Sequence, residues 1–425
     1  MKQKECSQGL LQEYRGYVER TRTKLRELRK GSKHWWKLSR QLLNRPEVTS
    51  NIPTLRRPDK SWARTPIGKT DILLQFFGTK WQLPEPVTNE YSDLPPTNIC
   101  HFGFIPIRVG KVRKFINRLR DDSATGPDLL PTRIIKAMAE SFLRPILILI
   151  RLILKKRTWP KMWCCHWVCP LYKKKSVFDP NNYRGLQITS QMFKFVEKII
   201  GDVCFPRLID NGLFGDSQFA YTPKRNARDA LLYLVLTWLL CFAQGNRVGL
   251  YCSDVSGAFD KVPAERLLQK LGAWAPRKAF LDVVTSWLRP RTARVIVAGE
   301  SSTEMVMKDM VYQGTVWGPW LWNTFFRDAA PVLRKHLFQE IVFADDLNAF
   351  KTYGRNTVNT RVYADLHKVQ QKVHRWGDAN QVSFDAGKES FHILSRLYKD
   401  RGPDGGNFRL LGICFDPKLL MGDAV

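Results

Sequence analysis

Residues 341–350 read Ile341-Val342-Phe343-Ala344-Asp345-Asp346-Leu347-Asn348-Ala349-Phe350, which is two short apolar runs around a pair of aspartates. The runs 341–343 and 347–350 predict the strands of a hairpin with the acidic pair at its tip. Adjacent carboxylates repel each other, and partial burial adds a desolvation cost. A hard divalent cation such as Mg²⁺ removes both penalties, because it prefers oxygen ligands. Taken alone, the pair also fits an ordinary solvated turn.

A third carboxylate follows another apolar strand. Alternating apolar residues over 248–252 lead into Asp254, a pattern that predicts a half-buried strand. If this strand lies beside the hairpin, Asp254, Asp345 and Asp346 converge on one spot. Two metal ions about 3.5–4 Å apart would there stabilise the attacking and leaving oxygens of a phosphoryl displacement. These three aspartates are the candidate metal ligands.

The rest of the chain mixes helical and strand patterns without internal repeats, which predicts an α+β fold. Helices are expected over 11–28, near 71–77, within 108–157, over most of 190–242, near 263–274 and 277–287, and over 320–336. Strands are expected over 163–172, 294–298 and 304–308, besides those named above.

The charge of the chain predicts a polyanionic partner. Among 425 residues, 68 Lys and Arg oppose 39 Asp and Glu, for a net charge of +29. The partner could be nucleic acid or an anionic membrane surface. The longest apolar runs, 231–242 and 146–154, are shorter than the roughly 18–20 residues that span a bilayer. The N-terminus lacks the apolar core of a signal peptide, so an intracellular location and no membrane partner are expected.

The first 70 residues hold 18 Lys and Arg against 6 Asp and Glu, a net of +12. An apolar stripe over 11–28 predicts a basic helix that stops at Gly31, with Trp35 and Trp36 beyond it. Such a segment can contact phosphates and stack on bases, or it can be a solvated helix with two anchoring tryptophans; both interpretations stay open. Residues 46–100 predict linker and irregular structure around the short helix at 71–77.

Nine cysteines, an odd and scattered number, argue against a disulfide framework. The tightest group is Cys164, Cys165, His166 and Cys169. A zinc site is conceivable there, but no second ligand pair stands at zinc-finger spacing. A strand with small buried thiols is the better interpretation.

Taken together, the motifs resemble those of the reverse transcriptase of non-LTR (LINE-type) retrotransposons, in the same order along 121–415. The matching segments are Thr125-Gly126-Pro127-Asp128, Trp163 to Lys173, Asn182-Tyr183-Arg184-Gly185-Leu186 with Phe193 to Lys198, Gln218-Phe219-Ala220-Tyr221 with Ala227 to Ala230, Asp254 to Asp260, Tyr312 to Pro319, Phe343-Ala344-Asp345-Asp346, Trp376 with Asn380, Lys388 and Glu389, and Leu411-Gly412-Ile413 with Asp416 and Leu419.

The resemblance implies a right-hand polymerase with helical fingers and a palm of antiparallel sheet backed by helices. It implies that Asp254 and Asp345 are the principal ligands of two Mg²⁺ ions, with Mn²⁺ as a substitute, and that Asp346 is the third carboxylate. Lys388 is implied as the general acid that protonates departing pyrophosphate, a role that suits a lysine whose pKa is lowered toward neutrality.

The resemblance also implies a set of nucleotide-binding residues. Lys173 and Arg184 correspond to fingers cations on the triphosphate, although Lys173 opens a run of three lysines and its register is open by one. Gln313 and Gly314 correspond to the loop near the nucleotide. Phe259 corresponds to a steric gate against the ribose 2′-hydroxyl, which argues against an RNA-dependent RNA polymerase. Without the resemblance, the two cations read as surface charges and Phe259 as a core residue.

Some positions depart from the family pattern. Gly185 stands where proline is usual, Phe343 where tyrosine is more common, and Trp317, Trp320 and Trp322 stand among positions that are usually small or aliphatic. None of these changes removes a metal ligand. Together they indicate a divergent branch.

The predicted domains are a basic helical region and linker over 1–100, fingers over 101–245 and a palm over 246–425 that ends at the primer-grip hairpin. The thumb and the upstream endonuclease of the family have no counterpart, so a fragment is expected. The implied function is RNA-directed DNA polymerase, with an RNA template, a DNA primer and deoxynucleoside triphosphates as partners and the nucleus as location. A catalytically silent nucleic-acid-binding fragment is the alternative. The sequence does not predict the oligomeric state.

Overall fold

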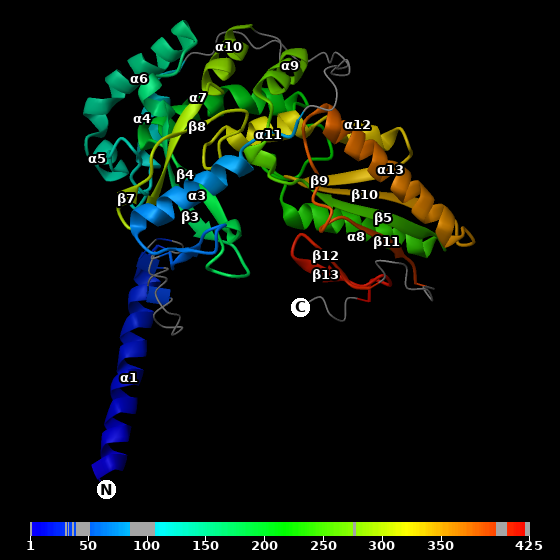
Figure 1. The fold of residues 1–425 in the computed structure, drawn as a ribbon, viewed down its shortest axis with the longest axis horizontal. Helices are drawn as coiled ribbons and strands as arrows, with labels where there is room; N and C mark the ends of the chain where they lie inside the picture. Colours follow the sequence, from blue (N-terminus) through cyan, green and yellow to red (C-terminus); the bar gives the residue numbers. More distant parts are fainter. Residues whose placement is uncertain are drawn as a thin grey trace.

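The computed structural model describes residues 2–29, 32, 34–35, 38–39, 52–85, 107–274, 278–396 and 406–420. Figure 1 shows two lobes, each built around a β-sheet and joined by helices that cross between them. Helices and mostly antiparallel strands make up both lobes, which confirms the α+β class. Gly31, the expected helix stop, and Trp36 lie outside the described residues.

The first sheet has four antiparallel strands in the order β11-β5-β10-β9. Its strands are β5 (Arg247–Asp254), β9 (Gln339–Phe343), β10 (Asp346–Tyr353) and β11 (Ser390–Leu394). In the β5–β10 register, Asp346 stands opposite Asp254 and Tyr353 opposite Arg247. The strands expected over 248–254, 341–343 and 347–350 are therefore confirmed, and the two that carry the aspartates are neighbours.

Helices cover both faces of this sheet (Figure 1). Helix α8 (Ala227–Ala243) packs against the face that holds Val248, Leu250 and Phe350. Helix α13 (Asn359–Ala379) packs against the other face. It approaches so closely that a Cβ atom at Gly249 would lie 2.7 Å from Cγ1 of Val362. Because successive side chains of β5 point to opposite faces of the sheet, the strand packs against α8 on one face and against α13 on the other.

The second sheet runs in the order β4-β3-β6-β7, with β8 paired to β6. Its strands are β3 (Cys165–Tyr172), β4 (Tyr183–Ile188), β6 (Arg291–Val297), β7 (Glu300–Ser301) and β8 (Met305–Met307). Strands β3 and β6 are parallel, and the other pairs are antiparallel. Strand β6 thus joins the sheet of β3 and β4, although it lies in the range 246–425 that was predicted as palm. The division of the chain into three domains stays a prediction.

Cys165, His166 and Cys169 lie in strand β3, as expected, and Cys164 ends the short 3-10 helix before it. His166 is fully buried, and its ring nitrogens lie 3.0 Å from Oε1 of Gln187 and 2.9 Å from Nη1 of Arg291. Burial, followed by the charge of Arg291, lowers the pKa of His166 well below 6.5. Across the described part of the chain, no three His, Cys, Asp or Glu side chains are grouped to hold a metal ion.

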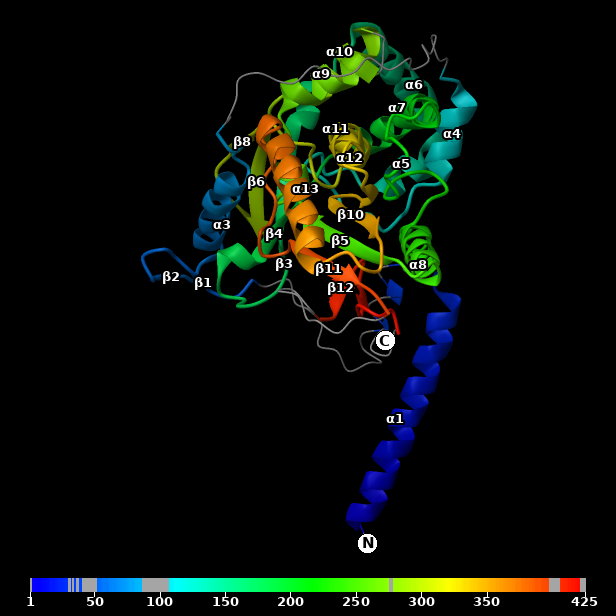
Figure 2. The ribbon, with the colours of Figure 1, turned by 90° about the vertical axis from the view of Figure 1, so that its right-hand side faces the viewer.

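Residues 52–85 are more regular than expected of a linker. Strands β1 (Leu55–Arg56) and β2 (Trp62–Ala63) form a short hairpin, and α3 runs from Pro66 to Lys80 rather than over 71–77 alone. Thr65 caps the helix by accepting from the backbone N–H of Gly68, and Pro66 occupies its first turn. Figure 2 shows α3 beside β4, β6 and β8. Phe77 of α3 packs over Gly185, where a Cβ atom would lie 2.8 Å from Cγ1 of Val168.

The remaining helices follow the expected pattern with shifted ends. The predicted helix over 320–336 is two helices, α11 and α12, and the predicted helical region 190–242 contains an irregular segment over 211–226. The other described elements are α1 (Lys2–Glu27), α4 (Val109–Asn117), α5 (Thr132–Ala137), α6 (Ala139–Lys156), α7 (Gln191–Asp210), α9 (Ala264–Trp274), α10 (Lys278–Trp287), α11 (Gly318–Phe326), α12 (Ala329–Arg334), β12 (Phe408–Leu410) and β13 (Ile413–Phe415).

Helix α1 stands apart from the other helices. Helix α1 projects from the rest of the chain in Figures 1 and 2. None of the described helices is both long enough and apolar enough to cross a membrane.

One buried carboxylate ties α7 to the segment before α11. Glu197 is fully buried and accepts hydrogen bonds from the backbone N–H of Val316 (2.9 Å), the backbone N–H of Trp317 (2.9 Å) and Nε1 of Trp287 (3.0 Å). Burial raises the pKa of Glu197 from 4.5 to about 7, although the three donors oppose the rise. The carboxyl group therefore fixes the loop that leads into α11.

Replacing Glu197 with Ala should lower the free energy of unfolding by about 1–3 kcal/mol, because buried donors would lose their acceptor. Glu197→Gln should cost less, since an amide oxygen still accepts. Unfolding in urea measures both, with exposed Glu300→Gln on β7 as the matched control.

The pH dependence gives a second readout of Glu197. The folded state keeps the proton to a higher pH than the unfolded state, so stability falls as pH rises between 4.5 and about 7. Glu197→Gln removes this contribution. The stability of the natural chain relative to the Gln variant should therefore decline with pH across that window, and an increase would contradict the assignment.

Candidate active site

Three carboxylates meet at one end of the four-stranded sheet. Asp254 ends β5, Asp346 opens β10 directly opposite it, and Asp345 occupies the turn before β10. Burial, followed by the charge of Asp254, raises the pKa of Asp345. Burial and the charges of Asp345 and Asp254 raise the pKa of Asp346. The cluster is therefore short of positive charge, which is the condition that a bound cation relieves.

The turn that carries Asp345 is held in a left-handed conformation. Ala344 has φ +60°, and its peptide groups are bonded on both sides. Its N–H donates to Oε1 of Gln218 (2.9 Å), and its carbonyl oxygen accepts from Nε1 of Trp322 (2.9 Å) and Nε2 of Gln218 (3.3 Å). Gln218 and Trp322 thus fix the backbone beside the acidic pair. Gln218 belongs to a segment that resembles the reverse transcriptases, but no pattern in the sequence predicts its contact with Ala344.

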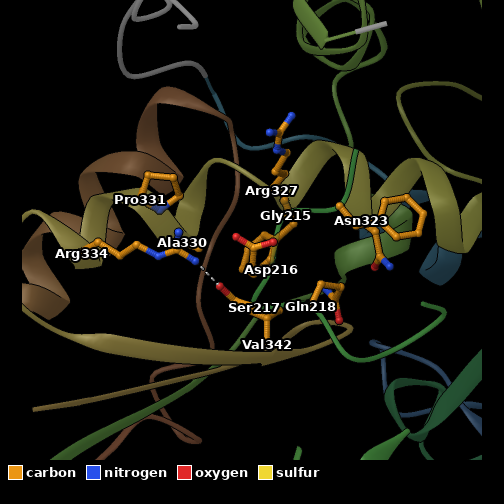
Figure 3. Close-up of a pocket in the computed structure, with 12 residues that line it drawn as sticks. Gly215, Asp216, Ser217, Gln218, Asn323, Arg327, Ala330, Pro331, Arg334 and Val342 are labelled. Carbon is orange, nitrogen blue, oxygen red and sulfur yellow. Dashed lines mark hydrogen bonds between the residues drawn. The ribbon is translucent and has the colours of Figure 1, made fainter. Parts of the chain in front are cut away.

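The segment before α8 holds the strand that leads into this turn through two backbone hydrogen bonds. Val342 donates its N–H to the carbonyl of Ser217 (2.9 Å) and accepts from the N–H of Phe219 (2.9 Å). Figure 3 shows the small cavity at this place, about 120 Å³, between β9 and helices α11 and α12. Arg334 closes one side, donating to Oγ of Ser217 (2.8 Å) and to Oε1 of Glu340 (2.7 Å).

Lys388 lies on the carboxylate cluster. Its Nζ forms an ion pair with Oδ2 of Asp254 and lies 3.5 Å from Oδ2 of Asp385. Asp385 is held in place because its backbone N–H donates to the carbonyl of Asp254 (3.0 Å). Burial acts to lower the pKa of Lys388, but the hydrogen bond and charge of Asp254 outweigh it and raise the pKa. The pKa of Lys388 is therefore raised in this structure, whereas the predicted role as a general acid calls for a lowered pKa.

The two fingers cations stand next to each other across the β3–β4 pair. Leu171 pairs with Arg184, and the N–H of Lys173 donates to the carbonyl of Asn182 (2.8 Å). Burial, then the charges of Lys388 and Arg184, lower the pKa of Lys173. The charge of Lys388 thus acts on the pKa of Lys173, which is the first of the run of three lysines. Lys388 and Arg184 both act to lower the pKa of Asp345, so cations from both sheets surround the carboxylate cluster.

Phe259 is partly buried in an aromatic cluster beside the hairpin. Its ring stacks on Trp322 with centroids 6.0 Å apart and an interplanar angle of 25°. Its other neighbour is Tyr221, whose ring lies edge-on at 6.5 Å. Trp322 is the same residue that bonds Ala344, so Phe259 connects to the catalytic turn through one side chain.

The loop that contains Gln313 and Gly314 contacts Asp260 and strand β4. Nε2 of Gln313 donates to Oδ1 of Asp260 (2.8 Å). Gly314 has φ +83°, and a Cβ there would lie 2.5 Å from the carbonyl oxygen of Gln187 in β4, so only glycine fits. Burial raises the pKa of Asp260 to about 7 against the opposing charges of Arg184 and Lys80.

Lys80 and Asp260 were not predicted as site residues. Nζ of Lys80, at the end of α3, donates to the carbonyls of Asn181 (3.2 Å) and Tyr183 (3.3 Å). Burial lowers the pKa of Lys80, while Asp260 acts to raise it. Lys80 lies in the segment taken for linker, so sequence spacing gave no signal for it.

The residues present offer the oxygen ligands that Mg²⁺ prefers, in three carboxylates with a deficit of positive charge. In the state described, however, Lys388 occupies an oxygen of Asp254. The described residues also show no close-set group of three His, Cys, Asp or Glu side chains fit for a metal. A metal ion at this cluster would compete with Lys388 for Asp254.

Comparisons with known proteins agree with this geometry. The family model described as reverse transcriptase (RNA-dependent DNA polymerase) matches residues 172–413. The chain is 25% identical over 303 residues to an RNA-directed DNA polymerase from mobile element jockey of Drosophila melanogaster, covering 69% of this chain and 32% of the relative. It is also 25% identical over 224 residues to a probable RNA-directed DNA polymerase from transposon BS of the same organism, covering 52% of this chain and 25% of the relative.

Among solved structures, the chain is similar to apo telomerase from Candida tropicalis truncated from its C-terminal domain. That likeness has a TM-score of 0.43 at 9% identity and covers 68% of this chain and 60% of the other. The chain spans about a third or less of the length of the two transposon relatives named above. The family match covers more than half of the chain and includes every aspartate of the cluster, and the chain therefore belongs to the reverse transcriptase family, whose fold is that of the right-hand polymerases.

Proposed function

We propose that the chain is an RNA-directed DNA polymerase of a non-LTR retrotransposon, which extends a primer 3′-hydroxyl by two-metal nucleotidyl transfer. The observation that carries the proposal is the β5–β10 register, which sets Asp254 opposite Asp346 with Asp345 in the adjoining turn. An RNA template, a DNA primer and deoxynucleoside triphosphates are the proposed partners. The nuclear location rests on the resemblance to retrotransposon proteins alone.

In this proposal, Asp254, Asp345 and Asp346 hold two Mg²⁺ ions, for which Mn²⁺ can substitute. When bound, the ions supply positive charge at the attacking and leaving oxygens. The raised pKa values of Asp345 and Asp346 support this role, because they reflect a carboxylate cluster with too little positive charge.

The chain's own cations would receive the triphosphate. Lys173 and Arg184 supply point charge and a planar guanidinium on one strand pair. Lys388 would protonate pyrophosphate, and to do so it must leave Asp254, since that ion pair raises its pKa. Gln313, Gly314 and Phe259 would form the wall around base and sugar, with Asp260 orienting the Gln313 amide.

Asp345→Asn should reduce Mg²⁺-dependent deoxynucleotide incorporation on a primed RNA template by at least roughly 10²-fold, the size of losing one preorganised charge. Primer extension by the full chain measures it. Asp121→Asn is the matched control, because Asp121 belongs to the other Asp-Asp pair and forms only an exposed ion pair with Lys136 at 3.1 Å. Undiminished extension by the Asp345 variant would overturn the catalytic assignment, and a natural chain that binds template–primer without extending it would favour the silent fragment.

Phe259→Ala should lower the preference for deoxynucleotides over ribonucleotides by roughly 10- to 100-fold, because a ring would no longer meet the 2′-hydroxyl. The measurement is the ratio of kcat/KM for the two sugars, since the loss of the Trp322 contact also slows both reactions. Phe259→Tyr keeps the ring and should keep the preference. An unchanged ratio in the Ala variant would assign Phe259 to packing alone.

Gln218→Ala should lower kcat by roughly 10²-fold with little change in KM, because the Ala344 peptide groups lose two of their three bonds and the carboxylates shift. Gln218 is a positioning residue, so Gln218→Glu is the informative second variant: it keeps the acceptor for the N–H of Ala344 and loses the donor to its carbonyl. Partial activity in the Glu variant supports the role, whereas a rise in KM with constant kcat contradicts it.

A further inference from the structure

A large groove opens between the β1–β2 hairpin, helix α3 and the loop 173–182 that joins β3 to β4. Its volume is about 730 Å³, within the range of pockets that hold nucleotide-sized ligands. Figure 2 shows the hairpin at the outer edge of the molecule, beside α3. We call it the aromatic groove, after the three rings in its lining; the residues used below are Arg56, Arg57, Trp62, Phe76, Phe178 and Asn181.

We propose that the aromatic groove binds single-stranded RNA, with an unpaired base stacked on the face of Trp62 and edge-on to Phe178, and a phosphate at Arg56. The inference rests on the proposed polymerase function and adds to it a binding site for the template strand before it is copied. No part of the groove belongs to the cluster of Asp254, Asp345 and Asp346.

The rings offer open faces. Trp62 is 42% exposed and Phe178 is 44% exposed, although both are large and apolar. They meet edge to face with centroids 5.8 Å apart and an interplanar angle of 88°, so a base that stacks on one ring meets the other at its edge. Phe76 adds a third, partly buried ring at the base. Exposed aromatic faces within a groove are the platforms on which unpaired bases stack.

The charge around the groove selects an anionic partner. Arg56 is exposed on the hairpin, and the exposed lysines Lys173, Lys174 and Lys175 precede Phe178 on the joining loop. The two acidic residues nearby serve local turns. Asp59 accepts from the N–H (2.9 Å) and the hydroxyl (2.7 Å) of Ser61. Asp179 accepts from the N–H of Asn181 (2.8 Å). The four cations named above therefore outnumber these two carboxylates.

Hydrogen bonds fix both walls of the groove. The backbone N–H of Arg56 donates to the carbonyl of Phe178 (2.8 Å), which locks the hairpin to the loop. Nη1 of Arg57 donates to Oγ of Ser61 (3.3 Å) and stiffens the hairpin turn. Because these contacts fix both walls, little ordering is needed on binding.

Helix α3 connects the groove to the nucleotide side of the site. Gln75, Phe76 and Thr79 line the groove, and Lys80 follows them at the end of the same helix. Lys80 bonds the carbonyls of Asn181 and Tyr183, and the charge of Asp260, which binds Gln313, acts on it. A strand in the groove therefore lies on the helix that carries Lys80 and on the loop that leads into the strand of Arg184, which suits template that has not yet been copied.

The test compares two primed RNA templates, one that ends at the templating base and one with a long single-stranded 5′ extension. Trp62→Ala and Phe178→Ala should weaken binding of the extended template, measured by fluorescence anisotropy, by roughly 5- to 100-fold more than binding of the short one. Arg56→Gln should also weaken it and reduce the slope of log affinity against log salt by about 0.7, the value for one phosphate of a single strand.

Two matched controls are available on other elements. Tyr233→Ala removes a ring that is 47% exposed on α8, and Arg151→Gln removes an exposed charge on α6. Neither should change the ratio of affinities for the two templates. A base analogue such as 2-aminopurine in the extension should be quenched by the natural chain and not by Trp62→Ala.

Equal affinity of the groove variants and the natural chain for the extended template would overturn the inference. So would a Trp62 effect of the same size on the short template, because the ring would then act through the fold. Loss of extension in Asp345→Asn with intact template binding tests the polymerase separately. An inactive natural chain whose RNA affinity still depends on Trp62 would count against the polymerase and not against the groove.

Discussion

Repulsion among three partly buried carboxylates is the constraint on which the rest of this structure depends. The β5–β10 register leaves no freedom in their spacing, because Asp346 stands opposite Asp254 and the turn places Asp345 beside them. Such a cluster is unfavourable unless cations surround it. Lys388 pairs with Asp254 directly, and Lys173 and Arg184 approach from the other sheet. In the proposed function, the cations that would receive a triphosphate are therefore the same ones that offset the repulsion among the carboxylates.

The constraint also explains why the turn is so heavily bonded. Ala344 adopts a left-handed conformation that a residue with a Cβ adopts only at a cost. Gln218 and Trp322 offset that cost with three hydrogen bonds to its peptide groups, and the segment before α8 pairs with β9 behind it. A turn under both electrostatic and backbone strain needs bracing from several elements. The bracing comes from α11 and from the segment before α8, so the geometry of the carboxylate cluster depends on the packing between them.

Much of the palm could be predicted from the sequence because its signals are local. Alternation around Asp254 and the apolar runs beside Asp345 gave the strands, and the family resemblance gave their neighbours. The contacts of Gln218 and Lys80 could not be predicted in this way. Gln218 bonds a residue 126 positions away, and Lys80 bonds carbonyls 101 and 103 positions away. Such pairings are set by how helices dock on sheets, which periodicity within one segment does not encode.

Residues 52–85 are a second region whose structure could not be predicted fully from local sequence patterns. Its turn residues and prolines suggested a linker, yet Leu55, Leu73 and Phe77 are buried at 1% exposure or less. The helix is amphipathic only weakly, because α3 packs against the second sheet on one side and the β1–β2 hairpin on another. A helix with neighbours on more than one side loses the clear apolar stripe by which a helix is recognised in sequence.

The departures from the family pattern turn out to be connected through packing. Gly185, in place of the usual proline, leaves room for Phe77 of α3 against β4. Trp317 donates to the carbonyl of Glu197 (2.8 Å) and stacks on Trp287, while Trp322 bonds Ala344 and stacks on Phe259. The unusual residues thus carry contacts between elements and hold no ligand themselves. Because Phe77 fills the space beside Gly185 and the two tryptophans pack on neighbouring rings, these departures alter the packing between elements and change none of the three aspartates.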